Sequence, residues 1–416
     1  MRRIASPTSR VRFGAARVDI TPPVGIYHRM WGAARHDQAT GVHRPLVGDV
    51  LVFAPLDVGR DVERTVRVQL DHVGFVTGQH ERLKAVVSDA AGVSLDQVAL
   101  TYSHTHSGGW YVPDRFALPG GDLISPYLDE LCRKLRHACR EAVQELREVV
   151  VTYASGRCDM AANRDCWDDD FGGYVTGYNP EHPIDNTVVV GRVTDQHGAL
   201  NHTFVHYACH PTTLAWENTL LSPDFVGSLR KEVEAHTGAP CTYLQGPSGD
   251  IGPKDGHQGD TAVADRNGKQ LAFAALSTLT SMGPPGHDFE YQVPVISGAT
   301  LGAWAYTPCT EERMAGSGVF DGGVYAVSLP LKPRRNLADL ERELADRNAR
   351  QDEADRQGDV IAARDHGARA ERARRSIARM DGLPDETEYA MRFSVCRMGD
   401  AIWVTCGGEP YNRRFA

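Results

Sequence analysis

The sequence lacks several features that would place it in a class at once. No segment reaches the roughly 18 consecutive apolar residues of a membrane-spanning helix, and the basic stretch Met1–Arg17 contains no apolar core of a secretory signal. Positive charge is not in excess, because 45 Lys and Arg face 54 Asp and Glu, a formal net charge of −9. This balance argues against nucleic acid or an anionic membrane as the main partner. We therefore expect a soluble, cytoplasmic protein with no transmembrane segment.

Cysteine also follows no recognisable pattern. The nine cysteines are odd in number, scattered, and include no CxxC pair. A chain of 416 residues needs no disulfide scaffold, so we expect free thiols and no cysteine-based zinc site. Repeats at solenoid periods are missing as well.

What is present predicts an α/β protein, in the mixed α+β sense of a mixed sheet flanked by helices. Hydrophobic residues make up 41% and charged residues 24%, an ordinary globular composition that excludes a wholly disordered chain. Strand-like and helix-like stretches alternate between residues 62 and 331. The predicted strands cover 66–70, 98–105, 187–193, 203–209 and 242–244, and the predicted helices cover 77–90, 125–146, 222–236 and 262–281.

A charged segment, Asn336–Met380, differs from the rest of the chain. Its apolar positions are sparse, and acidic residues alternate with arginines, which predicts a solvated helical hairpin packed by one thin apolar stripe. Gly358 and Gly367 are the positions where the helix is expected to be interrupted. We expect one catalytic-type domain over residues 1–416, with approximately 336–380 as an insertion.

Two histidines stand at the end of a predicted strand in the segment Thr101–Gly109. Alternation along an extended strand places His104 and His106 on one face, and Gly108 breaks the strand behind them. Imidazoles at i and i+2 are suitable donors for zinc. On this motif alone, two solvated histidines at a polar strand end remain an alternative.

His210 and Glu409 also follow predicted strands. Pro211 restrains His210 to extended backbone, and Pro410 follows Glu409 after two glycines that end an apolar run. Two histidines and one carboxylate form a common catalytic zinc set with an open position for water. Taken alone, Glu409 could equally be a surface glutamate. His202, near a turn, is expected to be exposed to solvent.

A glycine-rich loop, Gln245–Pro253, supplies candidate substrate-binding residues. They are Ser248, Gly249 and Asp250. Small residues after a strand bring backbone N–H groups close to a ligand and can form an oxyanion site, although a plain turn is an alternative. The loop is neither a P-loop nor a nucleophile elbow, because GK[ST] and GxSxG are both absent.

Asn163 and Arg164 follow a short predicted strand. A guanidinium in this place can hold a substrate carbonyl or carboxylate, while a structural salt bridge is the alternative. Asp71, at the end of the 66–70 strand, is a weaker candidate for orienting a ligand histidine.

Five segments, in this order, resemble motifs of the neutral/alkaline, non-lysosomal ceramidases. They are Asp19–Ile26 (DITPPVGI), Ser103–Gly108 (SHTHSG), Asn163–Arg164, His210–Thr213 (HPTT) and Gly408–Pro410 (GEP). From about Phe13 to its end, the chain is similar to the N-terminal catalytic domain of that family, whereas the charged insertion has no match.

The resemblance implies a function and a site. Family members hydrolyse the amide bond of N-acyl sphingosines in sphingolipid metabolism, with zinc activating water. The zinc ligands would be His104, His210 and Glu409, with His106 and Arg164 around the metal near the scissile amide.

The chain departs from the family pattern in three respects. Gly252 occupies the place of a serine in the family's glycine-rich loop. The sequence stops at Ala416, before the downstream tyrosine that completes the family's metal site. We further expect the chain to lack the family's C-terminal β-domain, which is associated with lipid and membrane substrates.

We therefore expect a zinc-dependent hydrolase of linear amides, acting on a small-molecule N-acyl substrate smaller or more soluble than ceramide. Arg164 would stabilise the oxyanion, and His106, a residue type whose pKa lies near neutrality, would transfer a proton to the leaving group. The alternative is a catalytically inactive or truncated paralogue that binds a metal or a ligand.

Overall fold

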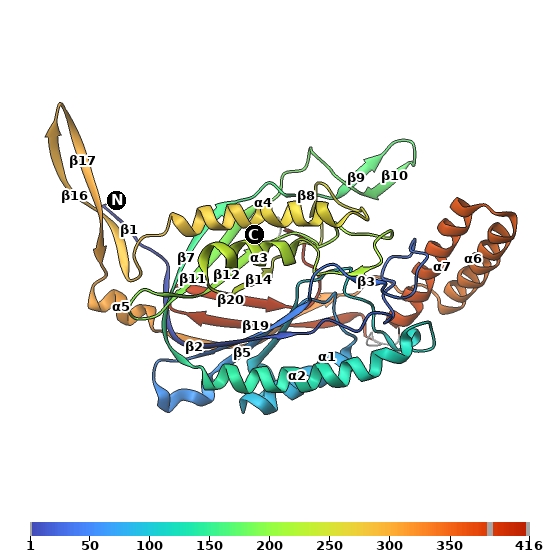
Figure 1. Ribbon diagram of the computed structural model, residues 1–416, viewed down its shortest axis with the longest axis horizontal. Helices are drawn as coiled ribbons and strands as arrows, with labels where there is room; N and C mark the ends of the chain where they lie inside the picture. The colour runs from blue at the N-terminus through green and yellow to red at the C-terminus, as the bar shows by residue number, and fades with distance from the viewer. Residues whose placement is uncertain (1, 381–385, 413–416) are drawn as a thin grey trace.

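The computed structural model describes residues 2–380 and 386–412, and its centre is an eight-stranded mixed sheet (Figure 1). In spatial order the strands are β14 (Cys241–Gln245), β12 (Leu200–Tyr207), β11 (Thr187–Thr194), β7 (Arg147–Arg157), β2 (Thr8–Asp19), β4 (Val47–Ala54), β5 (Thr65–Leu70) and β6 (Val98–Tyr102). Only the two edge pairs, β12 with β14 and β5 with β6, are parallel. This mixed sheet confirms the predicted α/β class.

Four long helices cover one face of this sheet. They are α1 (Thr77–Ala91), α2 (Ile124–Gln144), α3 (Phe225–Thr237) and α4 (Thr261–Thr280). Val50 of β4 packs beneath α1 and α2, and Val190 of β11 packs beneath α3 and α4. Leu51 of β4 and Val193 of β11 point to the opposite face of the sheet, because side chains alternate along a strand. Both belong to the core on that face.

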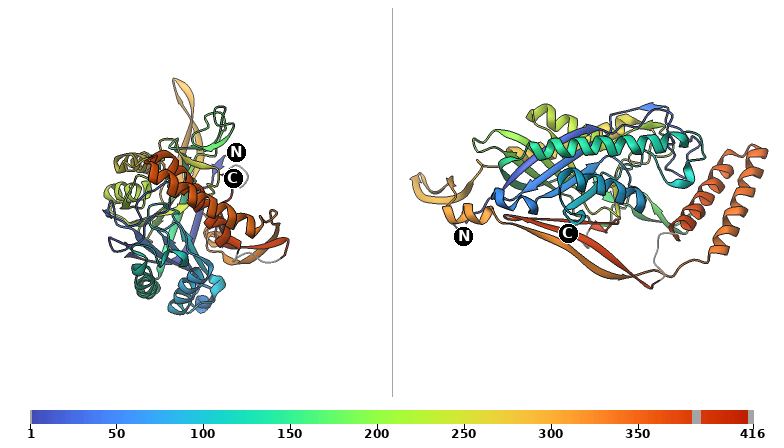
Figure 2. Two further views of the ribbon diagram at one scale, coloured as in Figure 1. Left: turned by 90° about the vertical axis from the view of Figure 1, so that its right-hand side faces the viewer. Right: turned by 90° about the horizontal axis from the view of Figure 1, so that it is seen from below.

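The other face is covered by a three-stranded sheet. Its strands are β18 (Phe320–Pro330), β19 (Glu388–Met398) and β20 (Ala401–Cys406), in that spatial order (Figure 2). Phe320 and Met398 pack against Phe53 in the core between the two sheets. The body therefore has three layers, helices, large sheet and small sheet.

Two arms extend from opposite ends of this body (Figure 1). One is the hairpin of β16 (His287–Ser297) and β17 (Ala299–Pro308), which pairs with β1 (Arg3–Ile4) and leads into α5 (Glu311–Ser317). The other is formed by α6 (Leu337–Gln357) and α7 (Val360–Met380). The predicted helical hairpin is therefore confirmed.

Of its two glycines, only Gly358 interrupts the helix, because it ends α6 in the left-handed region at φ 72°. Gly367 lies inside α7, where an added Cβ would meet Gln351 Oε1 at 2.9 Å, so it permits the close approach of the two helices.

The remaining elements are short. They are strands β3 (Gly41–Val42), β8 (Ala161–Asn163), β9 (Asp165–Asp168), β10 (Gly173–Thr176), β13 (Leu220–Leu221) and β15 (Ile251–Pro253), and 3-10 helices at Val58–Glu63, Leu95–Gln97, Pro113–Arg115 and Gly121–Leu123. All nine cysteines, each within the described ranges, are free thiols, as expected. A search of the described residues finds no helix with the length and apolar character needed to cross a membrane.

His202 is buried, so the prediction that it is exposed to solvent is wrong. Its ring lies in the core between the sheets, 5.5 Å from that of Phe13 and 5.1 Å from that of Phe204. Its Nε2 pairs with Thr242 Oγ1 at 2.9 Å, and Thr242 in turn donates to Asp49. Burial lowers the pKa of His202 to about 4.

We predict that His202 makes the fold sensitive to acid. Its pKa is lower in the folded state than in the unfolded chain, so its contribution is complete above about pH 6.5 and is lost as pH falls towards about 4. The full loss is about 3 kcal/mol for this residue. Denaturant unfolding of His202→Phe should therefore show a shallower loss of stability over this pH window than wild type, because Phe does not titrate and Thr242 keeps Asp49 as its partner. Parallel pH profiles for the two proteins would contradict the prediction.

Candidate metal centre

His104 does not lie in a strand, which corrects the predicted strand over 98–105. β6 ends at Tyr102, and His104 has φ 67°, a left-handed conformation that side chains other than glycine rarely adopt. The alternation argument for pairing His104 with His106 is therefore wrong. His104 is held instead by the chain after β5: its backbone N–H donates to His72 O at 2.9 Å and its Nδ1 to Val73 O at 2.7 Å.

The ring of His104 is oriented by that second bond. A carbonyl oxygen can only accept, so Nδ1 carries the hydrogen and Nε2 faces away from Val73. Strained backbone of this kind, costing about 1–3 kcal/mol, tends to persist at functional sites.

His210 is oriented in the same way by the glycine-rich loop. It follows β12, is buried, and donates from Nδ1 to Ser248 O at 2.8 Å. Its backbone N–H donates to Ile251 O at 3.2 Å. Burial first, and then the neighbouring Arg164, lowers the pKa of His210 to about 3, so its ring is neutral at neutral pH.

Glu409 reaches these two histidines from the end of β20. Gly407 and Gly408 break the strand, as predicted, and the carboxylate then lies 3.0 Å from His104 Nε2 and 3.5 Å from His210 Nε2. The contact with the His104 ring lowers the pKa of Glu409 to about 2, so the group is a carboxylate at neutral pH.

The donor set fits a metal ion. Ligand atoms about 2.0–2.2 Å from a tetrahedral zinc ion lie about 3.4 Å apart. The carboxylate of Glu409 lies at similar distances from His104 Nε2 (3.0 Å) and from His210 Nε2 (3.5 Å). The ligand atoms of His104, His106 and His210 also lie within 4.8 Å of one another. In His104 and in His210 the Nδ1 atom donates to a backbone carbonyl, an arrangement that is typical of metal-binding histidines. These residues could therefore hold zinc through nitrogen and oxygen donors.

His106 completes the cluster from a different direction. Its ring lies 5.1 Å from that of His104 and 5.5 Å from that of His210, and its buried Nε2 has no hydrogen-bond partner among the described residues. Burial, and then the two histidines and Arg164, lower the pKa of His106 well below its ordinary value. The expectation of a pKa near neutrality is therefore wrong, and the neutral ring offers an acceptor.

Arg164 lies beside the cluster, as expected, and its partner is a backbone group rather than a carboxylate. Nη2 donates to Gly249 O at 2.8 Å, and the backbone N–H donates to Asp250 O at 2.9 Å. Its field lowers the pKa values of His106 and His210. Among the described residues its hydrogen bonds go to backbone carbonyls and no ion pair holds the guanidinium, so the structural salt bridge weighed above is not found.

The loop residues expected to bind substrate make internal contacts that position the site. Ser248 Oγ accepts from Gln245 and its carbonyl orients His210. Gly249 N–H donates to Pro410 O at 2.9 Å, so this N–H is not free to bind an oxyanion. A Cβ on Gly249 would lie 2.4 Å from Glu409 O, so only glycine fits beneath Glu409.

Asp250 and Asn163 continue this positioning network. Asp250 Oδ1 accepts from the backbone N–H of Asn412 at 2.7 Å and Oδ2 from Asn163 Nδ2 at 3.4 Å. The segment that carries Glu409 is therefore fixed on both sides, at Gly249 and at Asn412. Direct substrate binding by Ser248, Gly249, Asp250 and Asn163 stays a prediction.

Asp71 does not orient a ligand histidine, which corrects that expectation. It is buried and pairs with Arg230, whose Nη1 lies 3.0 Å from Oδ1, and its other oxygen accepts from Val47 N at 3.0 Å. The group that orients His104 is the carbonyl of Val73, two residues further along.

The sequence did not point to two residues beside the cluster, Trp31 and His257. The Trp31 ring lies 5.2 Å from that of His106 and 5.8 Å from that of His257, and its Nε1 is buried without a partner. His257 has φ 58°, so two of the three residues other than glycine with positive φ among those described lie at this site. The signal that could have found Trp31 is its place shortly after the ITPPVG motif.

Comparisons with known proteins show the fold. No protein-family model and no curated protein sequence matches the chain. The crystal structure of neutral ceramidase from Pseudomonas aeruginosa is similar with a TM-score of 0.59 and 17% identity, over 96% of this chain and 62% of that one. A ceramidase complexed with C2 is similar with a TM-score of 0.54 and 19% identity, over 69% of this chain and 46% of that one. The resemblance noted from the motifs is confirmed as a shared fold, and the chain spans about half to three fifths of the length of these two proteins.

Proposed function

We propose that this chain, which has the fold of the neutral ceramidases, is a ceramidase-like amide hydrolase that depends on a metal ion. The observation that supports it best is that His104, His210 and Glu409 meet in space from three separate strand ends. We propose zinc as the ion, because two imidazoles, one carboxylate and an open position form a common catalytic zinc set.

When bound, zinc would activate a water molecule and polarise the substrate carbonyl. The chain's own residues prepare the rest of the reaction. Val73 O and Ser248 O fix the tautomers of His104 and His210. Arg164 has N–H groups beyond the one bonded to Gly249 O, and we assign them to the carbonyl oxygen of the substrate.

His106 is suited to moving a proton. Its ring is neutral and Nε2 has no partner, so it can accept a proton from the attacking water and pass it to the amine nitrogen as the C–N bond breaks. Carboxylic acid and amine are then the two products, and the histidine returns to its neutral form.

The substrate that we propose is a linear N-acyl amide smaller or more soluble than ceramide. The net charge of −9 does not favour a negatively charged bilayer as the source of the substrate. The alternative, a catalytically inactive paralogue that binds a metal or ligand, is favoured by Gly252. An added Cβ at this position meets only Thr212 and Arg164, both beyond 3.6 Å, so the absence of a serine there is not imposed by lack of space.

A metal-exchange experiment on the full chain tests the proposal. Protein stripped with a chelator should hydrolyse none of a panel of N-acyl amides with short and long acyl chains, and one equivalent of Zn²⁺ should restore turnover of at least one. His104→Asn, which tolerates the left-handed backbone, should bind zinc at least about 100-fold more weakly and lose turnover. His236→Asn on the exposed face of α3 is the matched control and should behave as wild type.

Two outcomes would overturn the proposal in different ways. Stoichiometric zinc in wild type with no hydrolysis of any member of the panel would favour the binding protein. Equal zinc content in wild type and His104→Asn would remove the metal site itself.

A further inference from the structure

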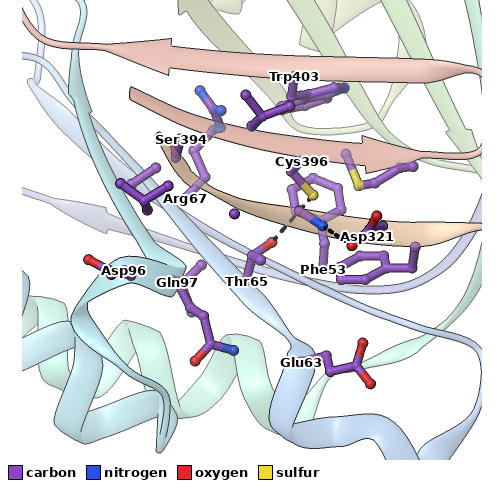
Figure 3. A pocket seen from close by; sticks show the side chains of 18 of the residues that line it. Phe53, Glu63, Thr65, Arg67, Asp96, Gln97, Asp321, Ser394, Cys396 and Trp403 are labelled. Carbon is purple, nitrogen blue, oxygen red and sulfur yellow. Dashed lines mark hydrogen bonds between the residues drawn. The ribbon is translucent and has the colours of Figure 1, made fainter. Parts of the chain in front are cut away.

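A cavity of about 290 Å³ lies between the large sheet and the three-stranded sheet, and its lining includes none of the residues of the candidate metal centre (Figure 3). Its floor is formed by β4 and β5 and its roof by β18, β19 and β20. The volume is just below the range of pockets for drug-sized ligands, which begins at about 300 Å³. The cavity is therefore large enough for a small organic ligand.

Arg67 is the charged group that reaches across this cavity. It starts on β5, extends towards β20 and lies beside Trp403, with its guanidinium carbon 5.0 Å from the centre of the indole ring (Figure 3). Its Nη2 donates a hydrogen bond to Thr405 Oγ1, which lies on β20 like Trp403. No carboxylate among the described residues pairs with the guanidinium. By contrast, Glu63 and Asp96 at the cavity pair with Arg60 and Arg392.

The surroundings make this unpaired cation costly. Arg67 is partly buried, which lowers its pKa to about 10, and only the Cys396 thiol partly offsets that effect. Buried cations in folded proteins are normally paired or bound to an anion. An unpaired arginine that lines a cavity therefore indicates an anionic ligand.

The walls define what the rest of that ligand is like. Phe53, Val324 and Trp403 present apolar surface to the cavity, and two carboxylates at its edge are already paired, Glu63 with Arg60 and Asp96 with Arg392. Asp321 adds a third carboxylate. These acids disfavour an anion of charge −2, such as phosphate, whereas a single carboxylate on an apolar body meets both Arg67 and the walls.

We propose that this cavity is a binding site for a small monocarboxylate with an aromatic or short aliphatic body, whose carboxylate is held by Arg67. Trp403 and Thr405 belong to β20, the strand that leads to Glu409, so a ligand bound here contacts the element that carries the candidate metal ligand. The site does not depend on the proposed hydrolase activity.

Calorimetric titration of the full chain with benzoate tests this site. Benzoate should bind saturably with one site per chain, whereas benzamide, which has the same shape without the charge, should bind at least about tenfold more weakly. Inorganic phosphate should not compete. Arg67→Gln should weaken benzoate binding at least about tenfold, and Arg67→Lys should keep part of the affinity.

Further variants decide between this cavity and other places on the chain. Val324→Phe fills the cavity and leaves Arg67 in place, so it should also abolish binding and would decide the matter if Arg67→Gln failed to fold. His104→Asn should bind benzoate as wild type does, because the metal centre is separate. Unchanged affinity in folded Arg67→Gln or in Val324→Phe, loss of binding in His104→Asn alone, or no saturable binding to wild type would each overturn the proposal.

Discussion

Replacing Glu409 by alanine should abolish both hydrolysis and tight metal binding while leaving the fold intact. The carboxylate contacts His104 and His210, the only two described residues with which it forms ion pairs, and about half of its side chain (48%) is exposed. Its removal therefore opens no core cavity. Loss of one ligand of three should lower kcat/KM by about a thousandfold or more and weaken zinc binding at least about 100-fold.

The control for Glu409→Ala is a substitution of another exposed carboxylate on or next to a strand of the small sheet. Glu388 begins β19 and accepts a hydrogen bond from Ser328, far along the small sheet from the candidate metal centre. Glu388→Ala should keep wild-type zinc content and turnover. Zinc content measured on dialysed protein, together with thermal unfolding, separates ligand loss from unfolding. Wild-type zinc affinity in a folded Glu409→Ala would contradict the assignment of Glu409 as a ligand.

Local sequence signals predicted the elements that position this site because strand ends carry such signals. Pro211 follows His210 directly, and the pair Gly407–Gly408 ends β20 before Glu409. Charge alternation likewise predicted the helical hairpin of residues 336–380, and Gly358 placed its turn. In each case the deciding interaction lies within a few residues along the chain.

Other features depended on contacts between segments far apart in the sequence. The left-handed backbone of His104 is held by His72 and Val73, which no period-two pattern can reveal. The pattern of small residues in the glycine-rich loop predicts a ligand-binding surface. In the structure, Gly249 has to be small because the backbone of Glu409, 160 residues later, lies directly against it. His202 was expected to be exposed because a turn lies nearby, whereas its burial follows from the second sheet.

A buried carboxylate, Glu371, helps to hold the charged hairpin against the body near the candidate metal centre. Almost fully buried, it pairs with Arg115, which is equally buried, and with Arg374 and Arg375 of its own helix at 2.7 and 2.8 Å. Burial raises the pKa of Glu371, and the arginines outweigh that effect and lower it. Arg375 also donates to the carbonyl of Met30, the residue before Trp31.

We predict that Glu371→Ala releases α7 from the body. Buried Arg115 would lose Glu371 and keep only Asp114, 3.4 Å away, and removing one partner of a buried ion pair costs about 3–5 kcal/mol. The close contact of α7 with the 30–35 loop, where a Cβ on Gly32 would lie 3.2 Å from Ala368, should be lost with it. Trp31 would then no longer be held against His106, so KM should rise more than kcat falls.

Limited proteolysis and kinetics read out the two parts of this prediction separately. Glu371→Ala should be cut within residues 336–380 at least about tenfold faster than wild type. The variant lacks the buried ion pair with Arg115 that opposes opening of the hairpin in wild type. The double variant Arg115→Met with Glu371→Leu should recover most of the protection, since an apolar pair leaves no unpaired charge at the most buried position, whereas Arg374 and Arg375 are partly exposed. Arg342→Ala, which removes an exposed pair with Asp339, is the matched control and should change neither measurement. Wild-type proteolysis in Glu371→Ala would show that other contacts hold the hairpin, whereas fast cutting with an unchanged KM would show that the hairpin does not position Trp31.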